Sequence, residues 1–163
     1  MAWTDYGYQI PAGLPGGIYD LSDKQIATRQ VDADTEVKPG MGVVVGATAG
    51  ETVAAVSSGS AADDFEGVFV HGSKNLEYDV NGEAATGGYE SIGVMQKGKI
   101  WVLIADTATT TYKNAAALIT DGDNAGKFTD SGDTSETSVV ALSDAIFTGV
   151  ADADNGIAVI QLS

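Results

Sequence analysis

The chain has no cysteine and a single histidine, His71, and these two shortages exclude several classes of functional site. Disulfide frameworks, thiol nucleophiles and iron–sulfur clusters need cysteine, and zinc sites with several histidine ligands need more than one histidine. His71 follows an apolar segment and has no Ser-His-Asp pattern around it, which is typical of a strand end rather than of a catalytic base. The sequence therefore predicts neither an enzyme nor a cofactor site.

Basic residues are also scarce. Lys and Arg number 8 against 23 Asp and Glu, which gives a formal net charge of −15 at pH 7. Such a surplus of negative charge repels nucleic-acid backbones and anionic lipid surfaces. No apolar run approaches the ~20 residues that span a bilayer, and the first residues carry neither the basic nor the apolar part of a signal peptide. We expect neither a nucleic-acid partner nor a membrane partner.

Glycine, in contrast, is abundant, with 21 residues spread along a chain of 163. This length is typical of one domain, and short apolar runs punctuated by Gly, Asp, Asn and Ser are typical of strands joined by tight turns. Helix signals are few. The predicted strands are Gln25–Val31, Gly42–Gly46, Glu66–His71, Tyr89–Met95, Lys99–Ala105, Ala115–Thr120, Ala145–Val150 and Ile157–Leu162.

Two dipeptides are the most specific turn signals. Lys97-Gly98 is predicted to form a hairpin turn between two strands, and Asn155-Gly156 to close another connection, because these residues tolerate positive φ. Residues 100–104 and 157–160 are apolar at successive positions, so both faces of the sheet should be covered there, in two stacked sheets or a barrel. Together these patterns predict an all-β fold, a β-sandwich or jelly-roll-like single domain.

The N-terminal residues break this pattern. Prolines and a Gly-Gly pair leave neither a helical nor an alternating period in residues 1–20, so we predict an extended N-terminal arm there and a β-rich domain over residues 21–163. The arm must cover its apolar residues against its own domain or against a neighbouring molecule. The candidate contact residues are Trp3, Tyr6, Tyr8, Ile10, Pro11, Leu14, Pro15 and Ile18.

Acidic turns raise the alternative of calcium binding. Asp152 to Gly156 begins like an EF-hand loop, but its glycine comes one place early and the twelfth position is Ser163 instead of Glu. Asp121 to Asn124 is shorter still. Solvated turns in which Asp and Asn cap their own backbone account better for both segments, and we predict no metal site.

Several segments, taken in their order along the chain, resemble the sequence motifs of one protein family. They are Pro11-Ala12-Gly13-Leu14-Pro15-Gly16-Gly17, Gly40-Met41-Gly42-Val43-Val44-Val45, Gly67-Val68-Phe69-Val70, the stretch from Gly93 to Val102, Gly126-Lys127-Phe128 and the stretch from Ala145 to Ile160. These motifs resemble the head cement, or decoration, proteins of tailed bacteriophages. The chain departs from the family where a basic residue usually follows the third segment, since His71 stands there instead.

This resemblance implies a structural virion protein that binds the exterior of the phage major capsid shell and cements neighbouring capsomers. Its implied partners are the major capsid protein and further copies of itself, in a homodimer or a homotrimer. The arm would contact the capsid or the sister subunit. Two alternatives remain open at this point: a carbohydrate-binding or adhesive β-sandwich, which needs exposed aromatics, and a carboxylate hydrolase, which needs a pair of acids across a cleft.

Overall fold

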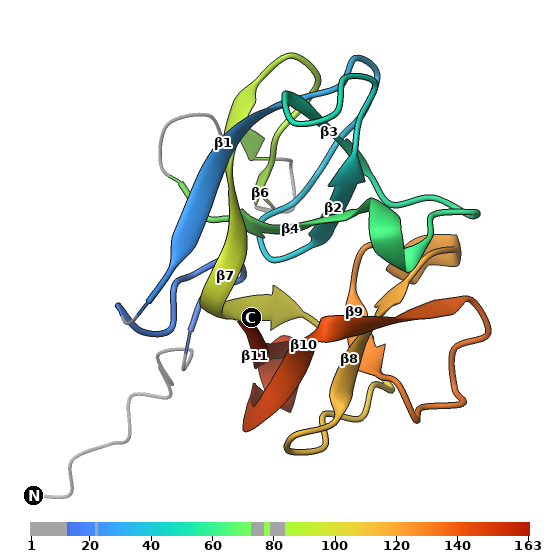
Figure 1. The fold of residues 1–163 in the computed structure, drawn as a ribbon. Helices are drawn as coiled ribbons and strands as arrows, with labels where there is room; N and C mark the ends of the chain where they lie inside the picture. Colours follow the sequence, from blue (N-terminus) through green and yellow to red (C-terminus); the bar gives the residue numbers. More distant parts are fainter. Residues whose placement is uncertain (1–12, 22, 73–76, 79–83) are drawn as a thin grey trace, which may run out of the picture.

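The computed structural model describes residues 13–21, 23–72, 77–78 and 84–163, and these residues are arranged almost entirely as β-strands (Figure 1). The strands are β1 (Gln25–Val31), β2 (Gly42–Val45), β3 (Thr52–Ala55), β4 (Phe65–Val70), β5 (Glu77–Tyr78), β6 (Ala84–Ala85), β7 (Ser91–Leu103), β8 (Ala115–Ile119), β9 (Phe128–Asp130), β10 (Val139–Asp152) and β11 (Ile157–Leu162). Short 3-10 turns lie at Ala62–Asp64, Gly122–Asn124 and Ala153–Asn155. The prediction of an all-β fold is confirmed.

Five of the strands close into a barrel, in the order β1, β3, β2, β4 and β7, because β1 pairs with both β3 and β7. Side chains that alternate along these strands fill its interior. The buried residues of this barrel core are Val31, Val37, Val43, Val53, Phe69, Ile92 and Val94. The predicted sandwich or jelly-roll arrangement is not confirmed, since the described strands form a closed barrel with further strands attached.

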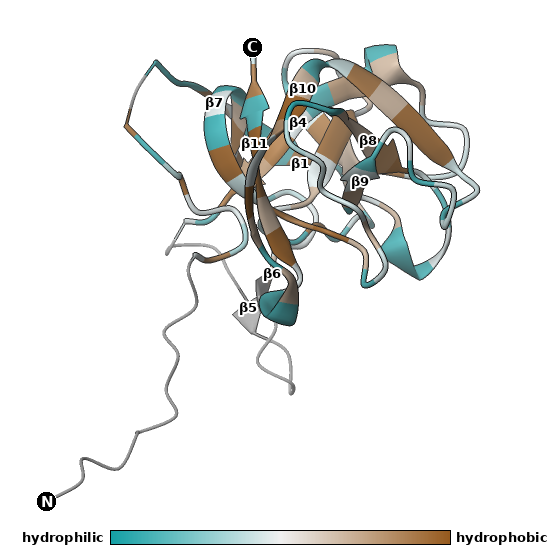
Figure 2. Cartoon of the chain, turned by 90° about the horizontal axis from the view of Figure 1, so that it is seen from below, coloured by the Kyte–Doolittle hydropathy of each residue, from teal (hydrophilic) through white to brown (hydrophobic). Residues whose placement is uncertain are grey.

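The further strands continue the sheet from the second half of β7, in the order β11, β10, β8 and β9. A bridge between Ile104 and Phe128 brings β9 back to the end of β7. A larger cluster of buried side chains joins the barrel wall to this second half; it includes Val68, Met95, Ile100, Phe128, Leu118, Phe147 and Ile160. Figure 2 shows apolar and polar bands alternating along the strands, as expected for a sheet that buries one face in a core.

Strand β7 belongs to both halves, and here a sequence prediction is wrong. Residues 91–103 form one continuous strand, without a hairpin turn at Lys97-Gly98. Lys97 pairs with Gln25 of β1, whereas Gly98 pairs with Leu162 of β11, so this dipeptide lies where β7 passes from the barrel to the second half. Gly98 has a φ of 121°, which glycine adopts without strain. The same preference marks hairpin turns, and this explains the error.

Other sequence predictions agree well with the structure. The bounds of β1 and β11 match the predicted ranges, and the connection through Asn155-Gly156 is confirmed, with Gly156 in the left-handed region at φ 63°. The successive apolar residues of β11 are buried on both faces, as expected. Strands β3, β5 and β6 were not predicted, β9 was indicated only by the family motif Gly126-Lys127-Phe128, and β10 begins at Val139, six residues earlier than expected. None of the helical turns in the described residues is long and apolar enough to cross a membrane.

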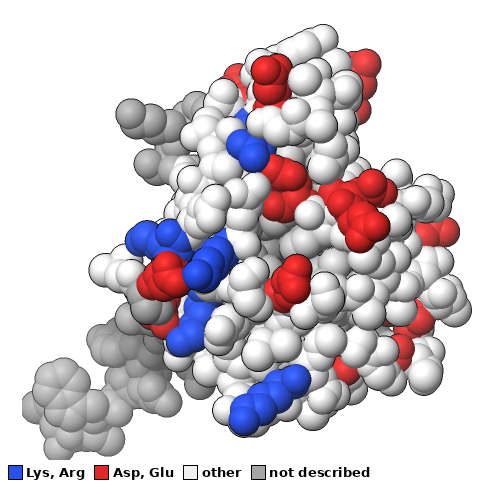
Figure 3. Space-filling model, in the orientation of Figure 1, with Lys and Arg blue, Asp and Glu red and all other residues white. Residues whose placement is uncertain are grey.

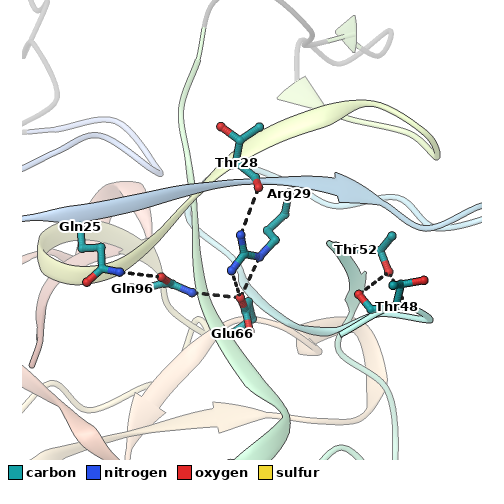
Figure 4. Close-up of polar contacts among 7 residues, drawn as sticks. All are labelled: Gln25, Thr28, Arg29, Thr48, Thr52, Glu66 and Gln96. Atoms are coloured by element: carbon teal, nitrogen blue, oxygen red, sulfur yellow. Dashed lines mark hydrogen bonds and ion pairs between the residues drawn. The ribbon is translucent and has the colours of Figure 1, made fainter. Parts of the chain in front are cut away.

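A charged pair lies on the interior side of the barrel wall (Figure 4). The Arg29 guanidinium is 2.7 Å from Oε1 of Glu66, and Nε2 of Gln96 donates a hydrogen bond to the same oxygen at 2.9 Å. Alternation along β1 places Arg29 on the same face as Val31, a residue of the barrel core. The two charged side chains are only 17% and 15% exposed, so each depends on the other for compensation.

Candidate functional site

Residues 13–20, which we call the N-terminal strap, lie against the second half of β7. The backbone N–H of Gly16 donates to the carbonyl oxygen of Trp101 at 2.8 Å, and the N–H of Trp101 donates to Gly17 at 2.9 Å. Ile18 forms a further antiparallel bridge to β7 and packs against the larger core cluster. The strap is thus paired with the sheet as a short additional strand.

Glycines allow the strap to approach this closely. A Cβ atom on Gly16 would lie 2.6 Å from the backbone nitrogen of His71 and 2.7 Å from the carbonyl oxygen of Phe69. Gly16 also has a φ of 74°, which side-chain-bearing residues rarely adopt. Its carbonyl oxygen accepts a hydrogen bond of 2.8 Å from His71. The Pro-Gly-Gly part of the sequence motif therefore fixes the strap between β4 and β7.

The strap covers Trp101. A Cβ atom on Gly13 would overlap the indole ring, so this glycine leaves the space that the ring occupies. Tyr19 packs against the Trp101 ring edge to face, with ring centroids 5.9 Å apart. Trp101 is only 5% exposed and forms a small core cluster with Ile157 and Val159. Burial of this tryptophan counts against a sugar-binding role for it.

The predicted contact residues fall into two groups. Trp3, Tyr6, Tyr8, Ile10 and Pro11 lie outside the described residues. The other three belong to the strap: Leu14 is 58% exposed, Pro15 packs against Gly40, and Ile18 is partly buried against the larger core. Within the strap, therefore, only Leu14 presents a large apolar side chain that was predicted for contact.

The structure adds apolar surface residues that the sequence did not single out. Tyr19 is 43% exposed, Leu21 82% and Ile26 40%. Together with Leu14 they form what we call the strap patch. Leu21 stands in a polar stretch between Asp20 and Lys24, so its isolation was the one available signal, and a single exposed leucine is too common to be informative by itself.

The two acidic turns that resembled calcium loops bind their own backbone. Oδ1 of Asp152 accepts a hydrogen bond from the N–H of Asn155 at 3.3 Å, and Oδ1 of Asp121 accepts one from Gly122 at 2.9 Å. This is the capping arrangement expected for Asx turns. In the part of the chain that the structure describes, no group of three or more His, Asp or Glu side chains could hold a metal ion.

Two other carboxylates carry dense hydrogen bonding. Hydrogen bonds from the side chains of Ser135 and Thr129 hold the pKa of Asp133 well below its ordinary value, against the opposing effect of burial. Thr129 Oγ1 donates at 2.7 Å. Burial alone would raise the pKa of Asp130, but hydrogen bonds from Gly132, Asn114 and Thr111 lower it overall. A hydrolase needs one carboxyl with a raised pKa, and neither of these two has one.

The comparison with protein families decides between the remaining alternatives. The sequence matches the model of the phage family described as structural cement protein (E217 gp24/Pam3 gp6) over residues 3–163. The chain belongs to this family. The resemblance stated from the sequence motifs is thereby confirmed, and the cement protein described here is a structural protein of a phage capsid. Its family is one of structural proteins, in agreement with the prediction that it is not an enzyme.

A solved structure shares the fold of this cement protein. A chain of "The capsid of Myoviridae Phage XM1" superimposes with a TM-score of 0.74, at 17% sequence identity, with 99% of this chain and 97% of that chain covered. No curated protein matches the sequence. At this identity the likeness shows that the arrangement of strands is the same, while the sequence itself has diverged.

Proposed function

We propose that this cement protein binds the exterior of the phage major capsid shell and holds neighbouring capsomers together. The match to the cement-protein family over residues 3–163 carries the proposal. The net charge of −15 supports the outer surface, because packaged DNA would repel an acidic protein on the inner surface. The proposed partners are the major capsid protein and further copies of the chain, in a homodimer or a homotrimer.

Cementing of this kind needs only a binding equilibrium that favours the assembled shell. A protein that binds only the assembled shell stabilises it by RT ln(1 + [L]/Kd) at each site, so many copies per particle add up to a large effect. No chemical step is needed. The requirement is a contact that is available on the assembled shell and lost when capsomers separate.

The N-terminal residues supply apolar groups for such a contact. Trp3, Tyr6, Tyr8 and Ile10 precede the strap, and we propose that they bind the capsid or the sister subunit. Proline at positions 11 and 15 restricts the backbone, and this lowers the entropy lost on docking. Because the strap is held on β7, this apolar segment joins the body of the protein at a fixed point, Gly13.

The test uses purified capsid shells of the phage that lack the protein. Full-length protein and a variant without residues 1–12, which keeps the strap, are mixed with the shells and sedimented. We expect saturable co-sedimentation of the full-length chain and a large loss of binding by the variant. Equal binding by both would rule out the contact role of residues 1–12, and no binding by full-length protein would refute the proposed function.

The outer location has its own assay. Antibodies against the protein are added to intact, DNA-filled particles, and labelling is examined by electron microscopy. The proposal predicts labelling of intact particles. Labelling that appears only after the particles are broken would place the protein inside.

A further inference from the structure

We propose that the strap patch, formed by Leu14, Tyr19, Leu21 and Ile26, is the capsid-facing surface of the folded body, with Lys24 at its border pairing with a carboxylate on the shell. This inference rests on the proposed function, since it names the face that docks. The partner surface for this patch is an apolar area on the outer surface of the shell that is bordered by acidic side chains.

Backbone pairing places two residues of the patch, Tyr19 and Ile26, along β7. Before and after residues 20–24 the chain runs antiparallel to this strand: Tyr19 donates its N–H to the carbonyl oxygen of Lys99 at 2.9 Å, and Ile26 pairs with Met95. Gly93 of β7 lies beneath Ile26, and a Cβ atom there would be 3.3 Å from the Ile26 side chain. Four of the six large apolar side chains exposed in the described residues belong to this patch.

Local charge distinguishes the patch from the rest of the molecule. Three of the chain's 8 basic residues, Lys24, Lys97 and Lys99, lie beside it. Lys97 is 2.6 Å from Asp23, and Lys99 is 2.9 Å from Asp20, so the three lysines exceed these two acids by one charge. Figure 3 shows basic side chains gathering on the side of β1 and the strap, whereas acidic side chains predominate toward the opposite side of this face.

This distribution favours docking through the patch. A chain with a net charge of −15 meets an acidic partner surface with least repulsion where its own charge is not negative. Apolar contact in the centre with charged groups at the rim is the usual composition of a protein interface. Lys24, whose charge is the one in excess of the two acids, fits a carboxylate on the partner surface.

The patch is also continuous with the N-terminal segment proposed to bind the shell. That segment of 12 residues ends at Ala12, directly before Gly13 and Leu14 of the strap. The backbone hydrogen bonds of the strap hold this junction on β7. Only residues 11–13 separate Ile10 from the patch in the sequence, so one partner can contact both.

The test compares matched pairs of variants in the full-length chain. Leu21→Asp and Tyr89→Asp both place a charge at an exposed apolar position, 82% and 71% exposed, but only Leu21 is in the patch. Lys24→Glu and Lys113→Glu both reverse one exposed charge, and only Lys24 borders the patch. Binding to shells that lack the protein is measured by co-sedimentation, and circular dichroism and urea midpoints verify folding.

We expect Leu21→Asp to weaken shell binding at least about tenfold and Lys24→Glu to weaken it several-fold, with both controls close to wild type. Wild-type binding that both patch variants retain would overturn this inference and leave the proposed function standing. Absence of binding by wild type would overturn both. If the patch variants instead change the sedimentation coefficient of the free protein, the patch is a contact between copies, and the inference is wrong.

Discussion

Substitution of Gly16 by alanine is the sharpest test of the strap. The added methyl group would lie 2.6 Å from the His71 nitrogen, 2.7 Å from the Phe69 oxygen and 2.9 Å from the Gly40 nitrogen. All three are backbone atoms, so no side-chain rotation can relieve the overlap. We therefore expect Gly16→Ala to displace the strap from β7 and to uncover Trp101.

The expected loss follows from the contacts of the strap. Four backbone hydrogen bonds, at Gly16, Trp101, Tyr19 and His71, hold it in place. At about 1 kcal/mol net for each, their loss costs about 4 kcal/mol of unfolding free energy. Exposure of the Trp101 ring adds about 2 kcal/mol for a large apolar side chain. If the strap stays bound, the left-handed backbone of Gly16 alone costs about 1–2 kcal/mol.

Fluorescence and denaturation separate these outcomes. The chain has 2 tryptophans, so the measurements are made in a Trp3→Phe background in which emission reports Trp101 alone. Gly122→Ala is the control, because Gly122 has a φ of 75° but nothing within 4 Å of an added Cβ. We expect a red-shifted emission and a loss of about 4–6 kcal/mol for Gly16→Ala, against about 1–2 kcal/mol and unshifted emission for Gly122→Ala. Equal losses with unshifted emission would refute the strap's role.

Three further predictions concern charges. The lowered pKa of Asp133 means that its carboxylate stabilises the fold at neutral pH, above the unfolded-state value, and that this contribution is lost as the pH falls below about 4; the difference in urea midpoint between wild type and Asp133→Asn should therefore shrink from pH 7 to pH 3, and a constant difference would contradict it. Glu66→Gln leaves the Arg29 charge without compensation and should cost about 2 kcal/mol, with partial recovery in the Arg29→Met double variant; no recovery would mean that the pair is not coupled. Calcium should not raise the melting temperature, because Asp152 and Asp121 already bind their own turns, and a shift that Asp152→Asn abolishes would contradict this.

Local sequence patterns predicted the all-β class well, because most strands here are short apolar runs with glycine-containing turns between them. Residues 157–162 are buried on both faces and flanked by a turn, so their bounds were clear from the sequence. The error at Lys97-Gly98 has a physical cause: a glycine with positive φ serves equally in a hairpin turn and in a bend of a continuous strand. The choice between them depends on which strands pair, and pairing is a long-range property.

The closure of the barrel could not be predicted for the same reason. It depends on β1 pairing with both β3 and β7, and the partners of β1 are about 20 and 65 residues away in sequence. The strap patch has a similar origin. Leu14 was predicted for contact, but Tyr19 and Leu21 were not, because their place near β1 depends on the return of the strap to β7.

The attachment of the strap to β7 also bears on how a cement protein resists separation of its partners. If the N-terminal segment and the strap patch hold the shell, a force on them passes first to the strap. An antiparallel strand pulled along its own direction loads its hydrogen bonds together, here those joining Gly16, Gly17 and Tyr19 to β7. Strand β7 in turn pairs with β1, β4 and β11 along its length, so the load spreads into both halves of the fold. Weakening the strap should therefore impair cementing even where the contact residues themselves are intact.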